Sequence, residues 1–280
     1  LDNLTGKLYG GNKVRKLEYI FPQVGEKQCQ RVATFGAVGS NSALATALFA
    51  RQCGFESTCF LMHQAKTAQI PATLNRHIQN GTELIRFGGP RSTRVQILRD
   101  HLHGRSAWVI PMGCSSWRGT VGFVAAGLEL AEQIACGEVP KPHRIYVGTG
   151  TMGTAIGIGL GLAIAELDTE VHAVRVSDPA ITNQRLLQNL CRKTVSMMHR
   201  LDAAVPADLA SRTRIRLRDG FFGDGYAHST AAAENAIAFA SEQLDITLEP
   251  TYTGKAMAAL LADLQEPGSE ELNMLFWNTY

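Results

Sequence analysis

Short runs of β-branched and aromatic residues alternate along the chain with longer segments of helical spacing. The runs predict strands at 32–35, 58–61, 83–87, 107–110, 144–147, 171–176 and 274–277. The longer segments predict helices at 42–52, 94–103, 120–135, 153–166 and 230–244. Strands that alternate with helices of this length are typical of βαβ units, in which helices cover both faces of a parallel sheet. The pattern therefore predicts an α/β fold.

One short stretch, residues 136–143, fits neither a helix nor a strand. It contains Gly137, Pro140 and Pro142, and proline breaks both helix interiors and central strands. We expect the chain to cross here between two lobes. Clefts between lobes are common binding sites for small ligands, so a small-molecule site is expected between them.

Composition narrows the possible classes of function. The chain is 45% hydrophobic and 19% charged, which excludes a disordered protein. With 27 basic and 25 acidic residues its net charge is +2, which gives no electrostatic basis for binding nucleic acid or a membrane surface. The cysteines form no C-x-x-C pair and the histidines form no H-E-x-x-H motif, so we expect no metal site. The cysteines also show no disulfide framework, so we expect a cytoplasmic location. The sequence begins at Leu1, and we expect residues to be missing from its front.

The first candidate for chemistry is the turn at 148–154, with the letters GTGTMGT between a predicted strand and a predicted helix. Backbone N–H groups at a helix start bind anions. The letters also match the dinucleotide fingerprint G-x-G-x-x-G, with Asp178 placed as the ribose-binding acid. The threonine hydroxyls favour a phosphate monoester over a dinucleotide. A glycine-rich turn without a ligand is the alternative for the motif alone.

A second candidate is Lys13, which follows Gly10, Gly11 and Asn12 at the first position of a predicted helix. The helix dipole is positive there and disfavours an ammonium, unless the site needs an amine, for instance to form a Schiff base. A solvated basic face shared with Arg15 and Lys16 is the other interpretation of the spacing.

Two further segments add polar groups at helix starts. Ser40 and Asn41, in the letters GAVGSNS, follow a predicted strand and open a helix, which makes a second anion site or a simple helix cap. Tyr252, in EPTYTGKAM, lies in a turn before a late helix and could stand over a ligand.

Taken together, these segments resemble the family of pyridoxal-phosphate enzymes that contains 1-aminocyclopropane-1-carboxylate deaminase and D-cysteine desulfhydrase. The shared motifs run in the family's order from LDNLTG through GGNKVRKLE, GSNSALA, PMGCSSWRGTVGFVAAGLEL, VGTGTMGT, GFFGDGYA and EPTYTGKAM to LFWNT. The resemblance implies two doubly wound open-sheet domains of the tryptophan-synthase-β type (fold type II) and a homodimer. It implies a larger cofactor domain at 1–30 and 137–280 and a smaller domain at 31–136.

The resemblance also implies roles for individual residues around pyridoxal 5′-phosphate. Lys13 would be the Schiff-base lysine and proton carrier. Ser40, Tyr252 and Tyr226 would be the other catalytic groups, with the substrate carboxylate on Ser40. The remaining cofactor contacts implied are Asn41, Gly150, Thr151, Met152, Gly153, Thr154, Thr253 and Thr279. The substrate contacts implied are Ser40, Asn41, Ser42, Trp117 and Arg118.

Two of these positions favour one reaction within the family. The deaminase type carries a glutamate where Thr253 stands, an acid that keeps the pyridine nitrogen protonated. A neutral hydroxyl at Thr279 does not enforce that protonation. We therefore predict β-elimination from a cysteine-like amino acid, in which D-cysteine gives pyruvate, ammonia and sulfide. The alternatives are aminocyclopropane carboxylate deaminase, a non-catalytic homologue and, outside the family, an NAD-dependent oxidoreductase.

The sequence also departs from the family's pattern. Cys114 stands in place of a glycine, and Trp117 and Arg118 in place of small or aliphatic residues. Asp224 replaces a proline and Tyr280 a glycine. An added arginine near the substrate suits a second anion such as a sulfonate, which makes L-cysteate sulfo-lyase a further alternative.

Overall fold

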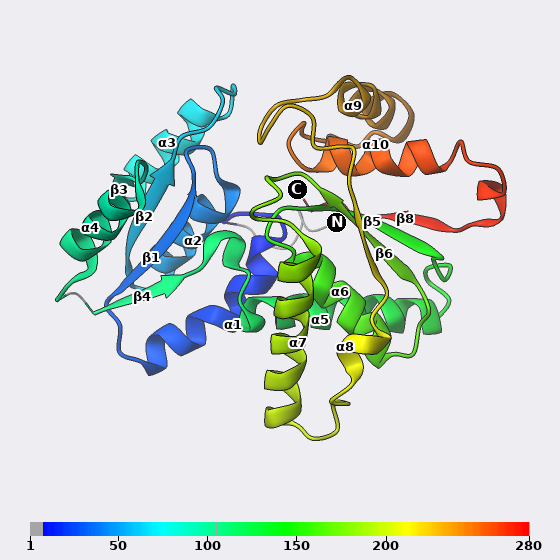
Figure 1. The fold of residues 1–280 in the computed structure, drawn as a ribbon, viewed down its shortest axis with the longest axis horizontal. Coiled ribbons are helices and arrows are strands. Elements are labelled where there is room, and N and C mark those ends of the chain that lie inside the picture. The colour runs from blue at the N-terminus through cyan, green and yellow to red at the C-terminus, as the bar shows by residue number, and fades with distance from the viewer. Residues whose placement is uncertain (1–7, 105, 280) are drawn as a thin grey trace.

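The computed structural model describes residues 8–104 and 106–279. Within them the strands form two parallel four-stranded sheets (Figure 1). The first has the order β3-β2-β1-β4, with β1 Arg31–Ala37, β2 Glu56–Met62, β3 Glu83–Arg86 and β4 Ala107–Ile110. The second has the order β7-β6-β5-β8, with β5 Arg144–Thr149, β6 Glu170–Arg175, β7 Ile215–Arg218 and β8 Met274–Phe276.

Helices connect the parallel strands and cover both sheets. The first half of the chain contains α1 Lys13–Glu26, α2 Asn41–Gln52, α3 Ile70–Gln79, α4 Arg91–Leu102, the 3₁₀ turn η2 Met112–Cys114 and α5 Trp117–Ala135. The second half contains α6 Gly153–Ile164, α7 Gln184–Leu201, α8 Leu209–Arg212, α9 Ala231–Leu244, α10 Thr253–Asp263 and the 3₁₀ turn η3 Ser269–Glu271.

The alternation of side chains along β2 explains how the first sheet is covered. Cys59 and Leu61 pack with Ala43 and Ala47 of α2, while Phe60 points to the other face and packs near α4. Successive side chains of a strand point to opposite faces, so a run of buried residues needs a helix on each side. Both faces of this sheet are therefore buried.

The second sheet repeats this arrangement. Ile145 and Val147 of β5 pack with α5 and α6, whereas Tyr146 packs on the opposite face with α10. Helices α5 and α6 lie against each other closely because glycines form their contact. A Cβ on Gly161 would lie 2.4 Å from the Val124 carbonyl oxygen, a distance that no larger residue permits.

The predicted strands are all present, and the α/β fold of type II is confirmed. Strand β7 was not predicted, because its IRLR sequence mixes apolar with basic residues at the edge of the sheet. The domain limits stay a prediction. Helix α5, which those limits place in the smaller domain, packs against α6 beside the second sheet.

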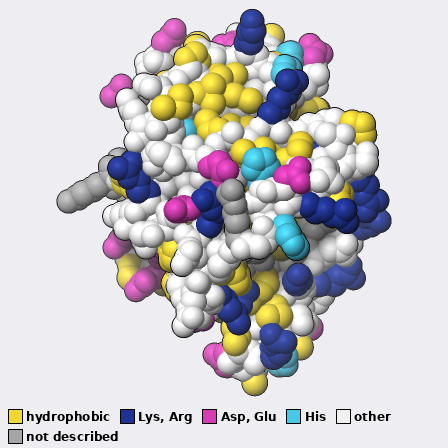
Figure 2. All heavy atoms as spheres, turned by 90° about the vertical axis from the view of Figure 1, so that its left-hand side faces the viewer, with side chains coloured by type: hydrophobic (Ala, Val, Ile, Leu, Met, Phe, Trp, Pro, Cys, Tyr) yellow, Lys and Arg dark blue, Asp and Glu magenta, His cyan; other side chains and the backbone are white. Residues whose placement is uncertain are grey.

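The surface shows no dominant charge on the side of the first sheet. Figure 2 shows both basic and acidic side chains on that face, with the basic ones densest toward the right-hand edge and a hydrophobic patch near the top. This mixture agrees with the net charge of +2. No helix in the described ranges has the length and apolar character needed to cross a membrane.

Candidate functional site

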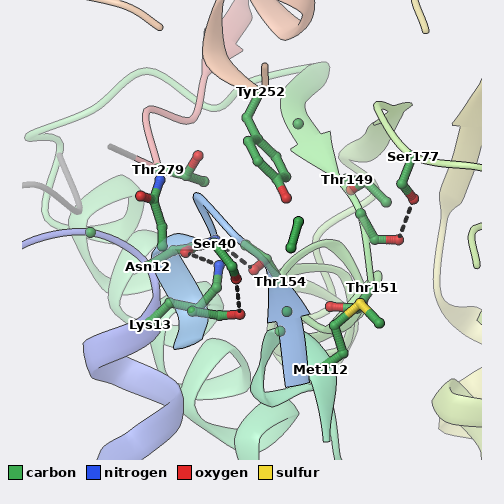
Figure 3. A pocket seen from close by; sticks show the side chains of 18 of the residues that line it. Asn12, Lys13, Ser40, Met112, Thr149, Thr151, Thr154, Ser177, Tyr252 and Thr279 are labelled. Atoms are coloured by element: carbon green, nitrogen blue, oxygen red, sulfur yellow. Dashed lines mark hydrogen bonds between the residues drawn. The ribbon is translucent and has the colours of Figure 1, made fainter. Parts of the chain in front are cut away.

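A cavity of about 250 Å³ lies where the carboxyl ends of the strands of both sheets meet the start of α1. Strand ends of parallel sheets are the usual place for ligands in this type of fold. The cavity is lined by the start of α1 with the residues before it, by the turns after β1, β2, β5 and β6, and by the η2 turn. Four further lining residues come from the last part of the chain: Tyr226, Glu249, Tyr252 and Thr279. Figure 3 shows side chains that line the cavity and labels ten of these residues.

The turn between β5 and α6 presents a helix start to the cavity. Gly150, Thr151, Met152 and Thr154 line it. Met152 has a left-handed backbone, with φ 65°, and is the residue that precedes the first turn of α6. The hydroxyls of Thr151 and Ser115 are hydrogen bonded at 2.7 Å. Backbone N–H groups and hydroxyls at such a turn form an anion site.

A buried cation lies directly behind this turn. Lys16 is 2% exposed, and its Nζ donates to the Gly113 carbonyl at 3.2 Å and to Ser115 Oγ at 3.1 Å. A Cβ on Gly153 would lie 3.1 Å from that Nζ. Lys16 therefore places positive charge at the anion site, a role that the sequence analysis did not assign to it.

Lys13 lies on the opposite side of the cavity, on the first turn of α1 (Figure 3). Its amine donates to Asn12 Oδ1, and Asn12 Nδ2 donates to Thr154 Oγ1 at 3.1 Å. The Asn12 backbone N–H donates to the Thr279 carbonyl at 3.1 Å. Asn12 thus joins the amine, the β5–α6 turn and the end of β8.

The start of α2 brings a second set of polar groups to the cavity. Ser40 Oγ caps α2 by accepting from the Ala43 N–H at 3.3 Å and lies 3.1 Å from Ser42 Oγ. Ser40, Asn41 and Ser42 all line the cavity, as predicted for the substrate side. A carboxylate suits a helix start of this kind.

Two phenols stand together at the cavity. Tyr226 and Tyr252 are linked by a hydrogen bond of 3.1 Å between their hydroxyls, and their rings meet edge to face. Burial raises the pKa of Tyr226, and it raises that of Tyr252 well above the usual value. Both phenols are therefore neutral at physiological pH and can donate or accept hydrogen bonds.

The comparisons with known proteins agree with this geometry. The family model described as "Pyridoxal-phosphate dependent enzyme" matches residues 1–277. This chain belongs to that family. Its cofactor is pyridoxal phosphate, and this decides between the two interpretations of the glycine-rich turn in favour of a monophosphate.

Relatives and solved structures place the chain more closely. A D-cysteine desulfhydrase of Salmonella schwarzengrund (strain CVM19633) is 29% identical over 95% of this chain and 80% of its own length. A crystal structure of an ACC deaminase homologue is 28% identical, with a TM-score of 0.78 over 99% of this chain and 82% of that one. A fungal L-serine ammonia-lyase from Rhizomucor miehei, 19% identical, has a TM-score of 0.62 over 96% and 84% of the two chains and shares the fold. The chain is a lyase of this family.

The cavity fits the pyridoxal-phosphate group on evidence internal to the site. Thr149 Oγ1 is buried at the cavity and, within the described residues, has no hydrogen-bond partner in the protein. A buried hydroxyl without a partner costs free energy, and a bound polar ligand removes that cost. Thr149, Thr151, Thr154 and Lys16 would hold the phosphate, and Lys13 lies across the cavity as the amine for the carbonyl.

The structure gathers most of the predicted site residues around the cavity. Those that line it are Lys13, Ser40, Asn41, Ser42, Gly150, Thr151, Met152, Thr154, Tyr226, Tyr252 and Thr279. The predicted residues outside the lining are Gly153, Thr253, Trp117 and Arg118. Gly153 is in the same turn and makes room there for Ser115 and Lys16.

Thr253 does not face the cavity as expected. Its Oγ1 accepts from the Glu249 N–H at 2.8 Å, and its own N–H donates to Glu249 Oε1 at 2.8 Å. Glu249 lines the cavity instead and also accepts the N–H groups of Thr251 and Tyr252. An acid, Glu249, is therefore present at this end of the cavity, four residues before Thr253.

The departures at 114–118 also have a structural basis. Arg118 donates to Gln23 Oε1 at 3.0 Å and stacks on the Trp117 ring, outside the cavity lining. It therefore offers no second anion site to a substrate. Cys114 has a φ of 56°, in the left-handed region that favours glycine, and its buried thiol contacts Thr46 Oγ1.

Proposed function

We propose that this enzyme catalyses β-elimination from a small cysteine-like amino acid, with D-cysteine and water giving pyruvate, ammonia and hydrogen sulfide. The observation that carries the proposal is one cavity with an amine, Lys13, on one side, an anion-binding turn on another, and a helix start with hydroxyls at Ser40 and Ser42. The relatives named D-cysteine desulfhydrase support this choice of substrate.

The cofactor, when bound, supplies an electrophilic carbonyl that joins the substrate amine and a ring that withdraws electrons from the α-carbon. Lys16 and the hydroxyls of Thr149, Thr151 and Thr154 would bind its phosphate. Thr279 lines the cavity in the segment that follows β8 and would face the ring nitrogen. The N-terminus of α2, with Ser40 and Asn41, would hold the substrate carboxylate.

Lys13 would remove the α-proton of the substrate. Its amine is held by Asn12 Oδ1, so it stays at one place in the cavity when it is not bonded to the cofactor. Tyr226 and Tyr252 are neutral, and one phenol can donate a proton to the departing sulfur while the other donates a hydrogen bond to the oxygen of the first. The aromatic rings also exclude water from the reacting carbon.

The alternative substrates are separated by particular residues. The sulfonate of cysteate would need a cation on the substrate side, and Arg118 does not reach the cavity. Ring opening of aminocyclopropane carboxylate needs strong electron withdrawal by a protonated ring. Glu249 is the acid at the cavity, but its carboxylate already accepts three backbone N–H groups at the start of α10. Elimination therefore remains the better fit.

A substrate panel tests the proposal. Purified enzyme with added pyridoxal phosphate is incubated with D-cysteine, L-cysteine, cysteate and aminocyclopropane carboxylate, and keto acid and sulfide are measured. Pyruvate and sulfide from D-cysteine should form at least tenfold faster than 2-oxobutanoate from the cyclopropane. Equal rates would support the deaminase instead. Borohydride reduction followed by peptide mapping should find the cofactor on Lys13, and a label on Lys16 or Lys255 would refute the assigned site.

A further inference from the structure

A segment after β6, residues 177–183, holds one carbonyl of the β5–α6 turn. Thr182 Oγ1 donates to the Gly150 carbonyl, and Ser177 Oγ donates to the same oxygen at 3.4 Å. The Ser177 Oγ also lies within hydrogen-bond distance of Thr182 Oγ1, so the Ser177 hydrogen is shared between that oxygen and the Gly150 carbonyl. Both residues are buried. Two hydroxyls on one carbonyl oxygen fix the direction of that carbonyl.

The segment that carries these hydroxyls is itself held in place. The N–H groups of Ile181 and Thr182 donate to the Asp178 carbonyl at 2.8 and 2.9 Å. Asp178 Oδ1 accepts the Ala180 N–H at 2.7 Å. Arg175, at the end of β6, donates to the Ser177 carbonyl at 3.3 Å. The clamp on Gly150 is therefore part of a turn with its own hydrogen bonds, and not a chance contact of two mobile side chains.

The direction of the Gly150 carbonyl determines the direction of the next N–H. In a planar trans peptide the carbonyl and the following N–H point opposite ways, and the described residues contain no cis peptide bond. With the carbonyl turned toward Ser177 and Thr182, the Thr151 N–H points away from them. Gly150 and Thr151 both line the cavity.

We propose that Thr182 and Ser177 are positioning residues that orient the Gly150–Thr151 peptide so that its N–H donates to the cofactor phosphate. The inference rests on the proposed placement of the phosphate at this turn. Thr182 lies outside the cavity lining, so its hydroxyl reaches the site through the Gly150 carbonyl, whereas Ser177 also lines the cavity. The two hydroxyls affect how much the phosphate group adds to the affinity for the cofactor. Without them the Gly150–Thr151 peptide could rotate and turn its carbonyl oxygen, instead of its N–H, toward the phosphate.

The contribution of the phosphate to binding is measured by the ratio of the dissociation constants of pyridoxal and pyridoxal 5′-phosphate. Apo-protein is titrated with pyridoxal 5′-phosphate and with pyridoxal, which lacks the phosphate, and binding is followed by absorbance. In the wild type the phosphate should strengthen binding strongly. Thr182→Val should weaken binding of pyridoxal 5′-phosphate by about tenfold, the loss of roughly one well-oriented hydrogen bond, and change that of pyridoxal less than twofold. Ser177→Ala should act in the same direction with a smaller change.

Two controls keep the test decisive. Thr194 of α7 is also buried, and its hydroxyl donates to the Leu190 carbonyl at 2.8 Å. Thr194→Val therefore removes a similar hydrogen bond away from the cavity and should leave the ratio of the two dissociation constants unchanged. Thr182→Ser keeps the hydroxyl and should restore the ratio, even if the valine variant folds poorly. Equal weakening of both ligands would refute the positioning role. A wild type that does not prefer the phosphate ligand would instead refute the proposed placement of the cofactor.

Discussion

Asn12 sets the direction of a chain of hydrogen bonds across the active site. Its amide oxygen accepts from the Lys13 amine, so its amide nitrogen must face Thr154 Oγ1, to which it donates at 3.1 Å. The Thr154 hydroxyl accepts that bond and keeps its own hydrogen for an acceptor in the cavity. The chain therefore ends in a donor, as a phosphate requires.

Asn12→Ala should slow proton transfer more than it weakens cofactor binding. Without the amide oxygen the Lys13 amine samples several positions, and misplacement of a catalytic base is costly in rate. We expect exchange of the substrate α-proton to slow by at least tenfold, measured by NMR in deuterated water, with a cofactor dissociation constant raised about threefold or less. Asn80→Ala removes an amide bonded to the Ala47 carbonyl and should not affect exchange. A larger loss of cofactor affinity than of exchange rate would contradict this role.

Single residues of the site could be predicted where a local motif marks them. Lys13, Ser40 and Tyr252 stand at helix starts with recognisable letters, and all three line the cavity. Lys16 lies one helical turn after Lys13, and residues three apart share a helix face, so that spacing could have identified it. Glu249 gave no such signal, because its role depends on where the start of α10 lies in three dimensions.

Helix caps provide a prediction at the scale of elements. Ser40 caps α2 at the cavity, and Thr230 caps α9 by accepting from the Ala233 N–H at 3.2 Å. Each substitution by alanine should cost about 1 kcal/mol of unfolding free energy, measured by urea denaturation. Only Ser40→Ala should also raise the KM for the amino acid, about tenfold, because only that hydroxyl would bond the substrate carboxylate.

Comparing Ser40→Ala with Thr230→Ala separates the role of Ser40 as a helix cap from its role in binding the substrate. The cofactor absorbance of both variants should match that of the wild type. Loss of the cofactor in Ser40→Ala would place Ser40 among the cofactor ligands, and an unchanged KM would remove it from the substrate site.

A buried carboxylate ties α10 to three strands of the second sheet. Asp263, 2% exposed, accepts from Tyr146 of β5 at 2.6 Å and from Arg218 of β7 at 2.5 and 2.7 Å. It also lies 3.5 Å from His172 Nδ1 of β6. Burial alone would raise the pKa of Asp263, but the hydrogen bonds from Arg218 and Tyr146 hold it below its usual value.

Asp263→Ala should therefore destabilise the fold without a direct effect on the cavity. Removing one partner of a buried ion pair costs about 3–5 kcal/mol, and we expect that loss in urea unfolding at pH 7. Because the folded pKa is lowered, the contribution of Asp263 is complete above its unfolded pKa of about 3.9 and declines as the pH falls below it. A loss under about 1 kcal/mol would show that the network adds little.

Elements were predicted best where the sequence is strongly apolar. Strands β1, β2 and β5 each contain at least three consecutive buried residues, most of them apolar or β-branched, and each was predicted at its place. Strand β7 was missed, since an edge strand is only partly buried and its basic residues carry no strand signal. The packing of α5 against α6 has no signal of its own in the sequence, because their glycine contact is a tertiary feature.

The whole molecule follows from the alternation of strands and helices and from the order of the motifs. Both point to two parallel sheets with a cavity at their carboxyl ends, as the structure has it. The homodimer and the cytoplasmic location stay predictions. Neither follows from the fold of one chain.

We expect His77 of α3 to make the stability of the whole molecule depend on pH. It is completely buried, and within the described chain neither ring nitrogen has a hydrogen-bond partner. Burial first, and then the charge of Arg76, lower its pKa to about 4. An unfolded histidine takes up a proton near pH 6.5. Between these two values the unfolded chain binds a proton that the folded chain excludes.

The free energy of unfolding should therefore be highest above pH 6.5 and should fall as the pH decreases from 6.5 to 4, by about 3 kcal/mol from this residue. His77→Phe and His77→Leu remove the titrating ring and leave no unpaired polar atom, so their stability at pH 7 should stay within about 1.5 kcal/mol of the wild type. Urea unfolding of all three proteins at intervals from pH 7.5 to 4.5 measures the effect. The wild type should lose stability faster than either variant below pH 6.5. Parallel curves would show that His77 takes up its proton without opening the fold, and the cause of any acid sensitivity would then lie elsewhere.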